Sequence, residues 1–204
     1  MKNLFKLCVI GSLAFACFSC NNSGSSDSKE AAKDSNEAKM DSTSTGGTTA
    51  TPATPAIPPS VSKADQDFAV NVADAGMTEV QAGQLAQQKG VGKDVKDYGA
   101  MMVKDHTEAA DKLKAIAASK NITLPSTVSS DMQKNLDDLQ KKEGKDFDKA
   151  YIDMMISDHK KVIGMFNDES KNGSDADIRA FANSTLHTLQ HHLDEAQKCK
   201  KMMK

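Results

Sequence analysis

The chain has 204 residues, enough for one ordinary domain, and its formal net charge of −2 argues against a basic surface that binds nucleic acid. Aromatic residues make up only 4% of the chain and tryptophan is absent, so an aromatic platform for sugars or nucleic acids is not expected. Alanine, lysine, aspartate, glutamine and methionine are plentiful, a composition that favours helices over sheets.

The N-terminal segment has the pattern of an export signal. Two lysines precede an apolar run of about twelve residues, which is too short for a membrane-spanning helix of ~20 residues. The run ends at Ser19 and Cys20, and a small residue before a cysteine that a polar stretch follows resembles a lipobox. We therefore expect a signal peptide over residues 1–19 and a lipid anchor on Cys20. Position −3 is Cys17 rather than leucine, so cleavage after Ala16 and a secretory signal without lipid are alternatives.

Residues 20–60 contain almost no apolar side chains and are rich in serine, threonine, glycine, aspartate and lysine, with prolines toward the end. Such a segment cannot bury enough surface to offset the entropy lost on ordering. We expect a lipidated, disordered Ser/Thr/Pro-rich tether that lets a folded domain stand off a membrane.

Residues 61–204 show apolar side chains at helical spacing and no convincing strand alternation. Glycine, proline and capping residues divide this region into segments. The expected helices cover residues 62–89, 93–119, 130–142, 144–171 and 175–204. Four long amphipathic helices and one short helix predict an all-α, antiparallel four-helix bundle with one extra short helix.

Two segments of this region share the pattern Y-x-x-M-M-[VI]-x-D-H: residues 98–106 and residues 151–159. A chance match over six defined positions is improbable. The repeat suggests two related helical hairpins around a pseudo-twofold axis, and ferritin-like bundles have this kind of organisation.

Each long helix also carries one ionisable residue on or beside its apolar stripe. These residues are Glu79, His106, His159 and His192, and each lies near the middle third of its helix. A buried carboxylate or imidazole costs free energy unless it is paired or coordinated. One glutamate and three histidines around a bundle core predict a transition-metal site.

Further side chains near these positions would tune such a site. Met102 and Met155 lie one turn before His106 and His159, and their soft thioethers would favour copper over iron. Asp105 and Asp158 lie at the stripe edges, where each carboxylate can orient a histidine. The outer partners expected around the metal are Asp105, Asp158, Tyr98, Tyr151 and Asp148, with Asp148 too far from His159 to share its metal directly.

Other interpretations of the same residues stay open. Methionines on an apolar stripe commonly fill a core, and Glu79 can form a hydrogen-bonded polar network with the histidines without any metal. Cys199 is a lone thiol that is buried and inert, pairs with another chain, or touches a metal. No histidine of the set has glutamate three residues before it, which argues against the di-iron carboxylate pattern and ferroxidase activity.

Residues ~63–200 resemble a widespread bacterial family of unknown function, often labelled as outer-membrane proteins and credited with a ferritin-like helical bundle. The resemblance rests on Glu79, the Met-Val-Lys-Asp-His run ending at His106, Phe147-Asp148 with Tyr151, His159, and Leu189-Gln190-His191-His192-Leu193. Residues 147–166 also resemble a second family of small Met/His-rich helical proteins that handle metals. Neither resemblance supplies an established activity.

Together these features predict a non-enzymatic envelope lipoprotein whose bundle binds or senses a transition metal, with copper as one candidate. The expected location is the outer membrane, facing the periplasm or the cell surface, with the lipid as the membrane contact, no nucleic acid, and protein partners unknown. The alternatives are a structural or interaction module with a hydrogen-bonded polar core, and a redox enzyme that uses the bound metal.

Overall fold

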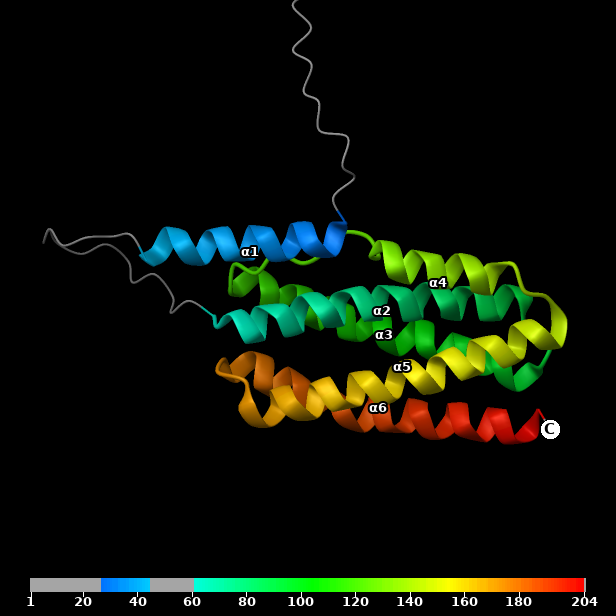
Figure 1. Cartoon of the computed structure of the whole chain (residues 1–204). Helices are drawn as coiled ribbons and strands as arrows, with labels where there is room; N and C mark the ends of the chain where they lie inside the picture. Colours follow the sequence, from blue (N-terminus) through cyan, green and yellow to red (C-terminus); the bar gives the residue numbers. More distant parts are fainter. Residues whose placement is uncertain (1–26, 45–60, 204) are drawn as a thin grey trace, which may run out of the picture.

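The structure is a computed structural model that describes residues 27–44 and 61–203 (Figure 1). These ranges contain six helices: α1 (Ser28–Ser44), α2 (Lys63–Lys89), α3 (Lys93–Ser119), α4 (Ser130–Gln140), α5 (Gly144–Asn172) and α6 (Ala176–Met202). The described residues include no strand, and none of their helices has the length and apolar character needed to cross a membrane. The expected signal peptide, Cys20 and the proline-rich segment lie outside the described residues.

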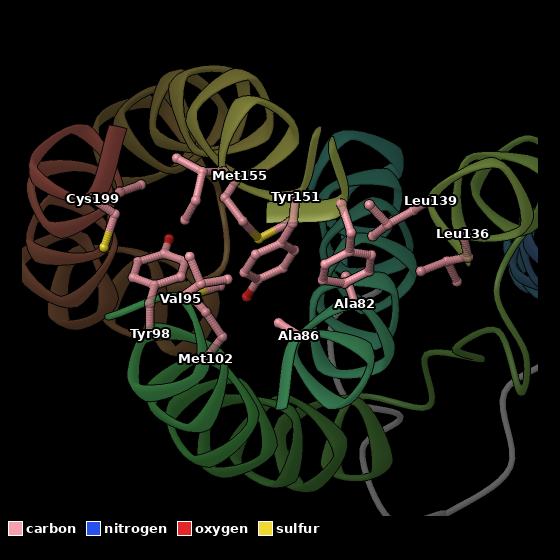
Figure 2. Close-up of a cluster of buried hydrophobic side chains, with 13 residues drawn as sticks. Ala82, Ala86, Val95, Tyr98, Met102, Leu136, Leu139, Tyr151, Met155 and Cys199 are labelled. Carbon is pink, nitrogen blue, oxygen red and sulfur yellow. The ribbon is translucent and has the colours of Figure 1, made fainter. Parts of the chain in front are cut away.

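The four long helices form a bundle of two antiparallel hairpins. Helix α2 packs along α3, and α5 packs along α6. The hairpins meet where α2 lies against α5 and α3 against α6, which leaves α3 and α5 diagonally opposite each other (Figure 2). Because the connection returns through α4 beside α2, α5 runs in the same direction as α3 (Figure 1). The prediction of an all-α four-helix bundle with one extra short helix is confirmed.

The helices begin where the sequence places capping residues. The Ser62 hydroxyl accepts a hydrogen bond from the Asp65 amide at the start of α2, and Asp175 accepts from the amides of Asp177 and Ile178 at the start of α6. These side-chain oxygens satisfy amides that the first turn of a helix leaves without a partner. The expected bounds of the five helices in residues 61–204 agree with the observed ones to within two residues.

Helices α2 and α3 approach each other closely because two glycines face each other between them. A Cβ atom built on Gly83 would lie 2.8 Å from the Gly99 carbonyl oxygen, and one built on Gly99 would lie 2.8 Å from the Gly83 carbonyl oxygen. Any side chain at either position would push the helices apart. This close approach brings Glu79 of α2 into contact with His106 of α3.

The buried core consists of two apolar clusters. The tyrosine cluster (Figure 2) contains Ala82, Ala86, Val95, Tyr98, Met102, Leu136, Leu139, Phe147, Tyr151, Ile152, Met155, Ala196 and Cys199. The phenylalanine cluster contains Val61, Phe68, Ala69, Leu113, Ala117, Ile122, Val162, Phe166, Ile178, Phe181, Ala182 and Leu189. One buried histidine separates the two clusters along each of α3, α5 and α6, and Glu79, with Asp74 one turn earlier, does so along α2. The bundle therefore encloses a polar layer between two apolar halves.

Helix α1 corrects the expectation of a disordered tether for residues 28–44, and the rest of residues 20–60 lies almost wholly outside the described residues. Helix α1 packs on α2 (Figure 1), and the Asn36 amide group donates to the Thr123 carbonyl oxygen at 2.9 Å and accepts from the Thr123 amide at 2.7 Å. The Lys29 ammonium lies 3.3 Å from the buried carboxylate of Asp74. Polar contacts to the bundle thus stabilise a helix that offers few apolar side chains of its own.

The repeated Y-x-x-M-M-[VI]-x-D-H motif lies on α3 and α5. The rings of Tyr98 and Tyr151 meet edge to face with centroids 6.0 Å apart, and those of His106 and His159 do so at 5.7 Å. The motif occupies the second helix of the first hairpin but the first helix of the second hairpin. The two copies of the motif therefore lie on two diagonal, parallel helices, one from each hairpin, as a pseudo-twofold axis along the bundle would place them.

Candidate metal centre

The polar layer consists of one side chain from each long helix. Glu79 of α2, His106 of α3, His159 of α5 and His192 of α6 are 2%, 7%, 0% and 1% exposed, respectively. One ring nitrogen from each histidine lies within 4.8 Å of a ring nitrogen of the other two. The structure thus brings together the four residues that the helical phasing singles out, and it makes the three histidines the closest group.

The proton positions on two of the imidazoles follow from their neighbours. His159 Nδ1 lies 2.9 Å from the Met155 carbonyl oxygen, which can only accept, so Nδ1 donates and Nε2 carries the lone pair. His192 Nε2 donates to Asp105 Oδ2 at 3.0 Å, so its Nδ1 carries the lone pair. These two lone-pair nitrogens lie 3.3 Å apart. In the neutral state no proton stands between them.

The third imidazole has one nitrogen beside a carboxyl group and one nitrogen without a partner. His106 Nδ1 lies 3.1 Å from Glu79 Oε2, and His106 Nε2 is buried without a hydrogen-bond partner among the described residues. The other oxygen of Glu79 lies 3.5 Å from His159 Nδ1. Glu79 therefore lies beside the Nδ1 atoms of both His106 and His159.

Burial keeps the histidines neutral and available as ligands. It lowers the pKa of His106 well below the ordinary value, with a further lowering by the repulsion that protonated His192 and His159 would exert. It also lowers the pKa of His159 to about 4. Burial also lowers the pKa of His192, although its bond to Asp105 opposes this shift. At neutral pH each ring thus keeps a lone pair, which is the form that binds metals.

The Glu79 carboxyl responds to the same environment in the opposite sense. Burial, together with the nearby charge of Asp158, raises the pKa of Glu79 to about 8. No positive charge in the described residues offsets this cost, because the neighbouring histidines are neutral. A cation bound at the histidines would favour the ionised carboxylate.

The spacing of one pair of these nitrogens, from His159 and His192, suits a tetrahedral metal. With metal–nitrogen bonds of about 2.0–2.1 Å, such a metal holds its nitrogen ligands roughly 3.3–3.4 Å apart. The separation of His159 Nε2 and His192 Nδ1, 3.3 Å, matches this value. Histidine ligands commonly donate their other N–H to a carboxylate or a carbonyl, and Asp105 and Met155 supply such acceptors here.

Several side chains expected around the metal have other contacts. Asp148 accepts hydrogen bonds from the amides of Val91 and Gly92 at the turn between α2 and α3, so both its oxygens are engaged there. Asp158 is partly buried, lies 3.9 Å from the Lys161 ammonium and makes no hydrogen bond to a histidine within the described ranges.

The methionines and tyrosines of the repeat lie in the tyrosine cluster. Met102 and Met155 are fully buried there (Figure 2), and their role as soft ligands stays a prediction. The hydroxyls of Tyr98 and Tyr151 are buried without a hydrogen-bond partner in the part of the chain that the structure describes. Cys199 is a free, buried thiol whose sulfur lies 3.8 Å from the Asp94 carbonyl oxygen, and it does not belong to the histidine group.

One group of the centre, a backbone carbonyl, cannot be identified from patterns of side chains. The Met155 carbonyl oxygen fixes the proton of His159, yet a backbone group carries no residue-type signal. Only the spacing of four residues on one helix hints at it, because helical carbonyls point toward the following turn.

Comparison with known proteins adds a family and a shared fold. The family described as "Domain of unknown function (DUF4142)" matches residues 50–199. A crystal structure of a DUF305 fragment from Deinococcus radiodurans is similar, with a TM-score of 0.61 and 8% sequence identity, and the match covers 71% of this chain and 98% of the fragment. At such low identity this likeness shows the fold alone. No curated protein matches the chain.

Proposed function

The chain belongs to the DUF4142 family, which carries no assigned activity, and we propose that its bundle binds a transition metal through His106, His159 and His192. One observation carries this proposal. Two buried imidazole nitrogens, both with lone pairs, face each other at 3.3 Å, and the unpartnered His106 Nε2 belongs to the same layer. Buried polar atoms without a partner are costly, and a single cation would satisfy all three.

The donor set restricts the metal. Imidazole nitrogens suit copper, zinc, iron and nickel, and the common order of affinity places copper(II) first among them. Asp105 orients His192, and Glu79 in its ionised form would balance part of the metal charge beside His106. Copper is our first candidate, and zinc is the second.

We further propose that the protein acts in the cell envelope. The support comes from the sequence: an apolar run after two lysines and a polar stretch after Cys20 match a lipoprotein signal. Lipid on Cys20 would hold the bundle at a membrane and place the centre among the metals of the envelope.

The second candidate function is a metal-free structural module. The chain of contacts from Asp105 through His192 and His159 favours it, because such a network can specify a unique core. On this interpretation the 3.3 Å contact holds a shared proton, and replacing the histidines lowers stability without any change in metal content.

Metal analysis separates the two candidates. The chain is purified without chelators or a histidine tag and titrated with copper, zinc and iron. We expect one equivalent of metal to bind, and we expect the joint substitution His106→Gln and His159→Gln to abolish binding. The matched control replaces His187 and His191, both exposed on α6, with glutamine. A well-folded protein that binds no metal, or a double variant that still binds it, would refute the proposal.

A further inference from the structure

A cavity of about 80 Å³ lies next to the polar layer on the side of the phenylalanine cluster. Its inner end is lined by His106, His192, Glu79 and Asp105, and its walls come from all four long helices and the loop before α4. Most of the wall is aliphatic or aromatic, as with Leu113 and Phe181. The polar layer thus borders this cavity on the phenylalanine side. Glu79 also lines a second hollow with Asp158 and Lys161, but none of the three histidines does.

The cavity has the size and polarity for a small uncharged molecule. One water takes about 30 Å³ in the liquid, and larger apolar cavities in proteins stay dry and take up apolar guests. An anion would lose its hydration against the apolar walls at a high cost in free energy. A diatomic molecule fits the volume without that cost.

The ligand count leaves room for such a molecule at the metal. Among the described residues, three histidines form the group, and no aspartate, glutamate or cysteine joins them as a fourth donor. Metal centres with three protein ligands keep a further position for an exogenous ligand, whereas closed structural centres use four. His106, whose buried Nε2 has no partner, lines the cavity.

Resting on the metal site proposed above, we propose that the three-histidine centre keeps one coordination position open toward this cavity. The position takes a small uncharged diatomic molecule of the dioxygen class. The apolar cavity serves as its chamber and excludes charged competitors. This position would add the binding of a small molecule to the proposed binding of a metal.

Gly76 offers a way to fill the chamber without disturbing the fold. It lines the cavity, and a Cβ atom built on it meets nothing within 4 Å. A leucine at this position has room to extend into the cavity, and it favours the helix more than glycine does. Gly164 on α5 is a matched control, because its Cβ also meets nothing within 4 Å and it does not line this cavity.

Carbon monoxide is the probe, because it is diatomic and uncharged and binds reduced copper. The full chain in detergent is loaded with copper, reduced with ascorbate and mixed with carbon monoxide, while the infrared C–O stretch and the stopped-flow rate are followed. We expect one carbon monoxide per copper. Gly76→Leu should slow association by about tenfold or more with copper content unchanged, and Gly164→Leu should leave the rate alone. Gly76→Ala should give a smaller effect in the same direction.

The outcomes separate the two proposals. A protein that holds copper but no carbon monoxide would overturn the open position, and so would a Gly76→Leu variant that binds it at the rate of the unchanged chain. A protein that holds no copper, zinc or iron would overturn the metal site itself.

Discussion

Asp105 fixes the orientation of His192 through a single hydrogen bond of 3.0 Å from Nε2 to its carboxylate. That bond determines which nitrogen faces the centre. Without it, neither the proton position nor the orientation of the His192 ring is fixed. Removing such an outer partner commonly weakens metal affinity by about 10–100-fold. We expect Asp105→Ala to raise the Kd for metal by this factor at unchanged stoichiometry, measured by competition with a chromophoric chelator.

The control for this prediction is Asp111→Ala, because Asp111 is exposed on the same helix and pairs only with Lys114 in the described structure. An Asp105→Ala variant with the original Kd would show that the hydrogen bond plays no part in binding.

Glu169 makes the folding stability of the bundle depend on pH. Burial raises the pKa of Glu169 to about 7, with further contributions from Asp65 and Asp168 that outweigh the nearby Arg179. A folded-state pKa above the unfolded value means that the folded state is more stable when this carboxyl group is protonated and neutral. Its contribution to stability is complete below the unfolded pKa of about 4.3 and is lost as the pH rises through about 7.

The unchanged chain should lose stability as the pH rises from 5 to 8. We expect the Glu169→Gln variant to lack this loss, because glutamine does not ionise. The gain over the unchanged chain at pH 8 should be on the order of 1–2 kcal/mol and should vanish near pH 4, as measured by urea unfolding at each pH. Glu108→Gln, at an exposed position on α3, is the control. A gain that does not depend on pH would contradict the assignment.

At the scale of elements, both hairpin turns are held by a carboxylate from the other hairpin. Asp65, at the start of α2, accepts from the amides of Ser174 and Asp175 at the turn between α5 and α6. Asp148, at the start of α5, accepts from the amides that precede α3. Each carboxylate satisfies amides that the turn leaves exposed, and each links the two hairpins at opposite ends of the bundle.

Replacing either residue with alanine should cost about 2–4 kcal/mol, because two hydrogen bonds to a charged acceptor are lost. The double variant should lose the sum to within about 0.5 kcal/mol, since the two turns share no partner. Urea unfolding measures all three variants. The metal content of Asp148→Ala should not change, and a lower content would place Asp148 in the metal site instead of the turn.

The long helices could be predicted from the sequence because their caps and apolar spacing are local signals. Ser62 and Asp175 mark helix starts, and the spacing of apolar residues sets which face is buried. The same phasing placed one ionisable residue of each helix inward, which is most of the candidate site. Helix α1 was missed because its stability depends on a distant partner, Thr123, that composition cannot reveal.

The finer structure of the site depends on proton positions and distances, which residue spacing does not encode. Phasing places Glu79 and the histidines in one layer, but it treats all four as equal ligands. In the structure Glu79 lies beside the Nδ1 atoms of His106 and His159. Side-chain torsion angles decide whether Glu79 would bind the metal directly or accept a hydrogen bond from a histidine that does.

At the scale of the whole molecule, the long connection through α4 decides the symmetry of the centre. A short turn after α3 would make the next helix antiparallel to it, and the two copies of the motif would then run in opposite directions. The return along α2 makes α5 parallel to α3 (Figure 1) and places it on the diagonal (Figure 2). The repeated histidines therefore meet at one level, and α2 and α6 close the layer from the remaining sides.

Helix α1 adds a docked element between the expected anchor at Cys20 and the bundle. Its contacts are mainly polar, so we expect it to open more readily than the long helices. Asn36 is 3% exposed and makes two hydrogen bonds to the Thr123 backbone. Asn36→Ala should lower the free energy of docking by about 2 kcal/mol and speed tryptic cleavage at Lys33 and Lys39 roughly thirtyfold.

The matched control is Glu37→Ala, because Glu37 is the exposed neighbour of Asn36 on the same helix. Cleavage is followed by mass spectrometry under conditions that leave the four long helices intact. Metal content should be the same before and after cleavage, since α1 supplies no member of the histidine group. If Asn36→Ala and Glu37→Ala are cut at equal rates, the Thr123 contact does not hold α1, and the segment acts as the tether that its composition predicts.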